Sequence, residues 1–517
     1  MRGYIGREST AFCLILLVGL GLHVTAPPAA AVDRPLRIAD TSMDPLTLHP
    51  HRSFDPNSDS IIGQIYEGLI DFNSEGNLVP KLAEYWLQQS PTRYRFWLRR
   101  GVSFHNGEPF DAEAVRSSVH HQFNETTRAA NSWLFDPGLR VQVIDRYTLD
   151  LITDRPDARL PYTLPMFLKI LPPKALRSAG DEGLARHPIG TGPYRFIHWE
   201  RGRSVRLEAY GAYWRRNLPR IKSVSFLFLP EADQIPALLE GKVDLVTKVR
   251  GNDTFKVMAA GNTKILKRQV AMVFWAAMRN EAGPFSDRRV RQAMNYAVNK
   301  NHLIHYVDKG NALNVSTMTA HIERGHNPFL TPYPFDPEMA RSLIYQAGYH
   351  NGFAVRCLAS EETADMIRAI QAQLRMVGVT LELTIVPREE YLRRTIVPKI
   401  ERGSPDFDGD MVVWLTPNPT MQAFFSPAVV FCSRSPYSIM NDPKFDRNYF
   451  AFVEEVDPDS RRQQLFRLQE LMLIEAYGIY TSQRVQTYGL DSRLQIDVHP
   501  SGMLAGDALA GAFWQNP

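Results

Sequence analysis

The stretch GVSFHNGEPFDAEAV, residues 101–115, carries the clearest local structural signal in this sequence. Asn106-Gly107 is a strong turn dipeptide, and Pro109 fixes the backbone where the chain leaves the turn. Asp111 can accept a hydrogen bond from the first turn of a helix that begins at Ala112. The stretch therefore predicts a tight turn that leads into a capped helix.

Strand and helix patterns alternate on both sides of this stretch. Alternating or continuous apolar runs predict strands at 35–40, 92–99, 147–153, 203–209, 354–360, 379–386 and 411–415, and helical spacing predicts helices at 58–70, 286–307, 336–348, 362–377 and 459–476. Residues 222–249 follow a strand, helix, strand order, which is typical of a crossover unit in a parallel or mixed sheet. We therefore expect an α/β protein whose two lobes enclose a cleft, where small ligands bind.

Composition excludes several functional classes. The 517 residues contain 59 basic and 55 acidic side chains, a net charge of +4, so neither a nucleic acid nor an anionic membrane is an expected partner. The chain is long enough for two or three lobes, and we expect a monomer. No Ser-His-Asp arrangement, phosphate loop or calcium loop is supported by the spacing, so we expect neither an enzyme nor a cofactor.

The N-terminus resembles an export signal. Arg2 and Arg7 precede the apolar run at 11–25, and the small residues 29–31 suit a signal peptidase. About fifteen apolar residues are too few to span roughly 30 Å of hydrocarbon. We therefore expect residues 1–31 to be a cleaved signal peptide and the mature protein to be periplasmic. Its two cysteines, Cys357 and Cys432, either form a disulfide or remain buried free thiols.

Several motifs together resemble one family over nearly the whole mature chain. In chain order they are DPLTLHPH (44–51), IYEGLI (65–70), SFHNGEPFDAEAV (103–115), HPIGTGPYRF (187–196), GKVDLV (241–246), FSDRRVRQAMNYAVNK (285–300) and DPEMARSLIYQAGY (336–349). This pattern is similar to extracellular solute-binding protein family 5, the substrate-binding proteins of peptide and nickel ABC importers. The resemblance implies a two-lobed periplasmic binding protein, type II, of the large cluster C class, which presents its ligand to an ABC permease and its ATPase.

The resemblance also implies a domain organisation. Lobe one is expected to comprise residues 33–268 and 490–517, with an extra subdomain at about 75–185, and lobe two residues 269–489. Hinges are expected at 268–273 and 483–490, so that the lobes close on a ligand.

Candidate ligand-binding residues follow from the same resemblance. Peptide receptors of this family carry an Asp three residues after a Trp, which binds the ligand's α-ammonium, whereas Trp414 is followed at that position by Pro417. In the nickel-chelate branch Trp133 and Trp414 match aromatic walls, and Lys169 takes the place of an Arg that grips carboxylates. The expected ligand-binding residues are Trp133, Lys169, Trp414, Thr416 and Phe54, and the ligand is a peptide or a nickel or other metal chelate.

The histidines give weaker signals. His49 and His51 flank Pro50, but two histidines without a third ligand predict polar contacts in a loop rather than a metal site. His120 and His121 point about 100° apart on a helix and cannot easily hold one ion together. We therefore expect no metal ligands in this protein. An alternative function on the same fold is a periplasmic sensor or chaperone-like receptor.

Overall fold

A computed structural model describes residues 34–39, 44–127, 129–395, 409–440, 442–504 and 507–515. The expected signal peptide, residues 1–31, lies outside these residues. Among the described residues, no helix has both the length and the apolar character needed to cross a bilayer.

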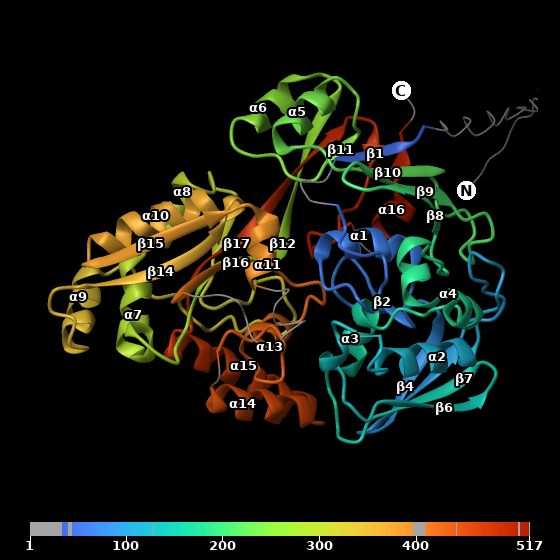
Figure 1. Cartoon of the computed structure of the whole chain (residues 1–517), viewed down its shortest axis with the longest axis horizontal. Helices are drawn as coiled ribbons and strands as arrows, with labels where there is room; N and C mark the ends of the chain where they lie inside the picture. Colours follow the sequence, from blue (N-terminus) through green and yellow to red (C-terminus); the bar gives the residue numbers. More distant parts are fainter. Residues whose placement is uncertain are drawn as a thin grey trace, which may run out of the picture.

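One mixed sheet of eleven strands runs through both halves of the molecule (Figure 1). Its order is β15-β14-β16-β12-β17-β11-β1-β10-β9-β8, with β13 added beside β17. The strands are β1 Leu36–Ala39, β8 Tyr194–Glu200, β9 Ser204–Ala209, β10 Ser223–Leu227, β11 Leu245–Val246, β12 Thr263–Met278, β13 Ala312–Asn314, β14 Phe353–Ser360, β15 Val379–Val386, β16 Met411–Pro417 and β17 Gly478–Asp491.

The first lobe is built around β1, which pairs in parallel with both β10 and β11. Helix α5 (Glu231–Leu239) connects β10 to β11, so the predicted crossover unit at 222–249 is confirmed. The other short elements of this lobe are α1 Pro56–Ile65, β2 Ile70–Phe72, β3 Leu78–Pro80, α6 Asp253–Ala259, β18 Leu494–Gln495, α16 Ala508–Gly511 and β19 Phe513–Trp514.

A second, antiparallel sheet lies within residues 75–185, the range expected to form a subdomain. Its order is β4-β5-β7-β6, from Ala83–Ser90, Arg93–Leu98, Thr148–Ile152 and Arg140–Asp145. Helices α2 (Ala112–Gln122), α3 (Leu160–Phe167) and α4 (Pro173–Arg186) and the short helix η1 (Ser132–Leu134) accompany it. Alternate residues of β5 are buried, as the sequence pattern predicts for a half-buried strand.

The second lobe contains β14–β16 and its own set of helices, of which only some lie on the faces of the sheet (Figure 1). The helices are η2 Pro284–Ser286, α7 Arg288–Ala297, α8 Lys300–Tyr306, α9 Pro337–Gln346, η3 Glu361–Thr363, α10 Ala364–Arg375, α11 Arg388–Thr395, α13 Phe425–Phe431, α14 Pro443–Glu454 and α15 Pro458–Glu475. The prediction of one helix at 286–307 was wrong. Val298 is extended, and the side chain of Asn299 accepts a hydrogen bond from the His302 amide, which begins a new helix.

The long strands β12 and β17 connect the two lobes. Their pairing shifts register between Gln269 and Val273, inside the expected hinge at 268–273. The expected lobe boundaries at 268–269 and 489–490 lie within these two strands, and the hinge assignment stays a prediction. Cys357 and Cys432 are both buried and free, so the free-thiol alternative holds.

The stretch 101–115 forms the predicted turn and capped helix. The Gly107 amide donates to the Phe104 carbonyl at 2.8 Å, and Gly107 has a φ of +84°. The Asp111 side chain accepts a hydrogen bond from the Glu113 amide and caps α2. The Glu108 carboxylate accepts bonds from the first amides of α4, those of Lys174 and Ala175. The motif therefore fixes the starts of two helices.

Candidate ligand-binding cleft

A cavity of about 490 Å³ lies between the two lobes. Its first-lobe side consists of the loop 46–55, the start of α1 and residues 247–250, and its second-lobe side of residues 360–363, part of α11 and the end of β16. Other lining residues come from β17, from α13 and the loop that follows it, and from the segment 502–504, and they include Arg484, Gln486, Phe425, Tyr437 and Met503. Helices α1 and α11 face each other across this region in Figure 1. A cavity of this size suits a small solute.

Aromatic side chains form much of the cavity wall. Phe54 stacks on Tyr437, with ring centroids 4.5 Å apart and planes 8° apart. Trp414 meets the Tyr391 ring edge-on at 5.6 Å. The Trp414 indole N–H is buried and has no hydrogen-bond partner among the described residues, so it is available to a ligand acceptor. The Thr416 hydroxyl is fixed differently, because it accepts a bond of 2.9 Å from the Trp275 indole.

A cationic cluster, defined here as Lys248, Arg388 and Arg484 around Glu362, spans the cavity. Lys248 forms an ion pair with Glu362, and the Arg388 Nη1 atom lies 3.1 Å from the other Glu362 oxygen. Burial alone would raise the pKa of Glu362, but the three cations hold it well below its usual range. Three cations face Glu362, and Asp308 also faces Arg484, so the cluster still has one more positive than negative charge, which suits an anionic group.

Asp59 is a second carboxyl group that lines the cavity, and its pKa is raised, whereas that of Glu362 is lowered. Burial raises the pKa of Asp59 to about 7, and the nearby Asp55 charge acts in the same direction. The Ser53 hydroxyl donates to Asp59 at 2.7 Å, which partly opposes this rise. Asp59 also lines a small second cavity beside Lys169, Glu67 and Lys81. It is therefore the link between the cleft and a buried charged network.

The structure brings Phe54, Trp414 and Thr416 together in the cleft wall. Trp133 and Lys169 lie behind that wall. Trp133 meets the Tyr437 ring at 6.3 Å, and Lys169 is 8% exposed with its ammonium 2.5 Å from the Pro165 carbonyl. Ligand contact by all five predicted residues stays a prediction.

Sequence reasoning missed the cationic cluster. Lys248, Glu362 and Arg388 each follow closely after the end of a strand, β11, β14 and β15 respectively. In open α/β sheets, ligands bind beyond the carboxyl ends of the strands. That rule, applied to the predicted strands ending at 360 and 386, would have selected Glu362 and Arg388. It would not have selected Lys248, which lies inside the strand predicted within 222–249. Arg484 lies inside β17 and has no such signal.

Comparison with known proteins decides the family. Residues 77–430 match the family described as bacterial extracellular solute-binding proteins, family 5. The chain belongs to this family. The chain is thus the substrate-binding component of an ABC importer, and its fold is that of a two-lobed periplasmic binding protein.

Relatives and solved structures of this family 5 protein agree with that assignment. It is 29% identical over 375 residues to the glutathione-binding protein GsiB of Pectobacterium atrosepticum, covering 70% of each chain. Its fold matches the DppA binding protein of Helicobacter pylori in complex with the peptide STSA, with a TM-score of 0.81, 21% identity and coverage of 93% and 98%. It also matches NikZ of Campylobacter jejuni in complex with Ni(L-His), with a TM-score of 0.79, 18% identity and coverage of 89% and 94%. These relatives are transport binding proteins rather than enzymes.

Proposed function

We propose that this family 5 protein captures a small peptide-like solute that carries at least one free carboxylate. The cationic cluster is the observation that carries the proposal, because Lys248, Arg388 and Arg484 exceed the single charge of Glu362. A ligand carboxylate placed there gains charge-assisted hydrogen bonds. The protein then delivers the solute to a membrane permease and its ATPase, after export with cleavage of residues 1–31.

The other end of the ligand is expected to meet the aromatic wall. Pro417 stands where peptide receptors of the family have an acidic ammonium anchor, so a free α-ammonium is not the main recognition feature. Phe54 and Trp414 offer flat apolar faces, and the Trp414 indole offers one donor. GsiB relatives are named for binding glutathione, a short peptide with two carboxylates. A ligand of that chemical class suits the charges and the size of this cavity.

Calorimetry with a small panel tests the proposal. We expect glutathione or another short acidic peptide to bind, and the form in which every carboxyl group is esterified, which carries no carboxylate charge, to bind about 10-fold to 100-fold more weakly. Arg484→Gln should cause a similar loss, whereas Arg206→Gln on the exposed surface of β9 should not. An ester that binds as tightly as the acid would overturn the proposal. Binding of a nickel–histidine complex alone would favour the metal-chelate alternative instead.

A further inference from the structure

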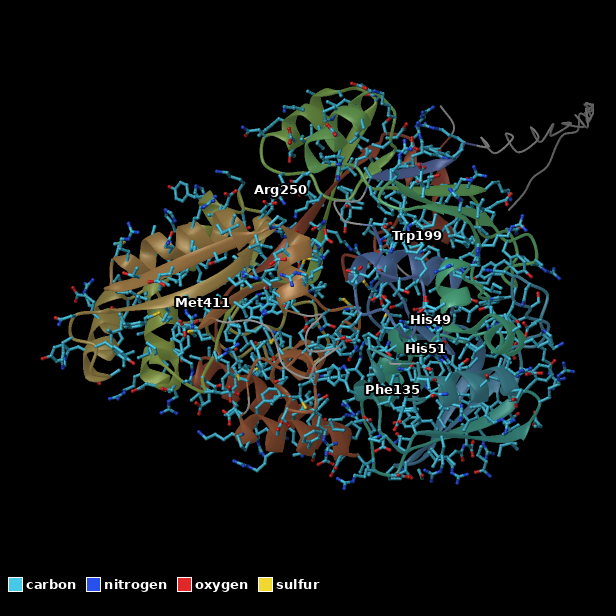
Figure 2. The ribbon with its side chains drawn as sticks, viewed as in Figure 1. His49, His51, Phe135, Trp199, Arg250 and Met411 are labelled. Atoms are coloured by element: carbon cyan, nitrogen blue, oxygen red, sulfur yellow. The ribbon has the colours of Figure 1, made fainter. Side chains whose placement is uncertain are left out.

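Three histidines and an aspartate meet behind the cleft wall, in the first lobe (Figure 2 labels two of them, His49 and His51). His49 and His51 come from the loop 44–55, His121 from the last turn of α2, and Asp181 from α4, directly after the break in that helix at Gly180. His49 and His51 are fully buried, and His121 is 7% exposed. The fold thus supplies the third and fourth polar groups that the sequence spacing did not show.

One ligand atom each from His49, His121 and Asp181 lies within 4.8 Å of the other two. Asp181 Oδ1 is 2.7 Å from His121 Nε2 and 3.6 Å from His49 Nε2. Ligand atoms around a tetrahedral zinc ion, with bonds of about 2.0–2.2 Å, are about 3.3–3.6 Å apart. The pair at 3.6 Å already has this spacing, and the pair at 2.7 Å must move apart, so side-chain adjustments on the order of 1 Å bring the three atoms to zinc-binding distances. Asp181 is partly exposed, which leaves room for a water molecule as the fourth ligand.

The hydrogen bonds of His51 determine which nitrogen of neutral His121 carries the proton. His51 Nε2 lies 2.8 Å from the Lys169 carbonyl oxygen, which can only accept, so this nitrogen carries a proton. In neutral His51 the other nitrogen, Nδ1, accepts, and His121 Nδ1 donates to it at 3.0 Å. Neutral His121 then directs the lone pair of Nε2 at the Asp181 carboxylate. Two acceptors at 2.7 Å repel each other unless a proton lies between them, or unless a metal ion binds both and moves them apart.

His49 supplies the observation that favours a metal ion. Its Nε2 atom is fully buried and has no hydrogen-bond partner among the described residues, and it is directed at the same Asp181 oxygen from beyond hydrogen-bond length. A proton between His121 and Asp181 would leave this atom unsatisfied, whereas a metal ion would bind it. Zinc binding through Nε2 moves the His49 proton to Nδ1, where it faces the His51 amide, the donor of a long bond of 3.3 Å. The metal–ligand bonds must therefore offset the loss of this hydrogen bond and the contact between two buried donors.

We propose that His49, His121 and Asp181 bind one zinc ion, with His51 holding His121 in place from behind. Histidine and carboxylate ligands suit zinc, and a second residue that accepts from the ligating imidazole is a usual feature of such sites. None of the three ligands lines the cleft, so this zinc is a structural ion and not cargo. Since Arg52, Phe54 and Asp55 of the same loop do line the cleft, the ion fixes the first-lobe wall.

Zinc titration of the mature protein, purified without a histidine tag and stripped with a chelator, tests the site. We expect one zinc per chain in competition with a chromophoric chelator. His49→Gln, His121→Gln and Asp181→Asn should each weaken binding at least 100-fold, and His51→Gln about 10-fold to 100-fold. The matched control is His321→Gln, since His321 and His326 form another histidine pair, 3.2 Å apart at the surface. It should leave the affinity unchanged.

Absence of stoichiometric zinc binding, full affinity in His49→Gln, or loss of binding in His321→Gln would each overturn the site. Because a variant could lose zinc simply by failing to fold, a second measurement uses the unmodified protein. X-ray absorption at the zinc edge should show two imidazoles and oxygen ligands, and a spectrum with fewer than two imidazoles would also refute the proposal. Zinc should raise the unfolding temperature of the unmodified protein and not that of His49→Gln.

Discussion

At the scale of single residues, Trp414 is the aromatic side chain from which the largest effect on binding is expected. Replacement of Trp414 by Ala removes aromatic area and the free indole donor from the cleft wall. We expect ligand binding to weaken by roughly 1–3 kcal/mol, measured by calorimetry. Trp199→Phe, on β8 outside the cleft, is the control and should bind normally. Unchanged affinity in Trp414→Ala would remove this residue from the site.

Asp59 makes the stability of the protein depend on pH. Its pKa rises from the usual value for an aspartate to about 7 in the folded protein, so the folded state binds more protons than the unfolded state between about pH 4 and 7. Stability from this group is therefore lost as the pH rises through that window. Asp59→Asn, which keeps an acceptor for Ser53, should raise the unfolding temperature relative to the unmodified protein at pH 8 and have little effect at pH 4. An equal effect at both pH values would contradict the assignment.

These residues also show which parts of the site could be predicted from the sequence and which could not. Phe54, Trp414 and Thr416 could be predicted because a family resemblance aligns local motifs, and the structure places all three in the cavity wall. The cationic cluster could not be found in this way, because Lys248, Glu362, Arg388 and Arg484 come from four distant segments and only the folded sheet brings them together. The pKa of Asp59 depends on burial, which no local pattern reports.

At the scale of elements, the motif at 103–115 and the motif at 187–196 are hydrogen-bonded to each other, although about 80 residues separate them. The amide of His105 donates to the Gly190 carbonyl, and its Nε2 atom lies 2.9 Å from the Gly192 carbonyl, to which it donates. A methyl group added at Gly192 would lie only 2.4 Å from the Gln64 carbonyl, at the end of α1. The sequence predicted the turn and helix of the first motif correctly, since caps and turns are local, but it could not show this contact.

Gly192→Ala should therefore destabilise the protein by about 1–3 kcal/mol, because backbone atoms of α1 must move to admit the methyl group. The measurement is the shift in the urea unfolding midpoint. Gly211→Ala is a matched control, since an added methyl group there meets nothing within 4 Å. A midpoint for Gly192→Ala equal to that of Gly211→Ala would show that α1 does not pack as described.

At the scale of the whole molecule, the two lobes share one sheet but meet across the cleft through side chains. The sequence predicted the α/β class and most elements, because apolar periodicity is local. It missed the continuity of the sheet through both lobes, which depends on pairing between β12 and β17, more than 200 residues apart. It also missed the ion pair between Lys248 of the first lobe and Glu362 of the second, which joins the lobes directly.

This ion pair should favour the closed arrangement of the lobes. Lys248 and Glu362 are mostly buried, and burial lowers the pKa of Lys248 to about 8 against the opposing pull of Glu362. Glu362→Gln keeps the shape but removes the charge, at a cost of about 1.5–3 kcal/mol to the closed state. That shifts the ratio of closed to open molecules about 10-fold or more. Small-angle X-ray scattering should then report a larger radius of gyration for Glu362→Gln than for Glu361→Gln, the neighbouring exposed glutamate with the same change in charge. Equal radii in the two variants would show that the pair does not hold the lobes together.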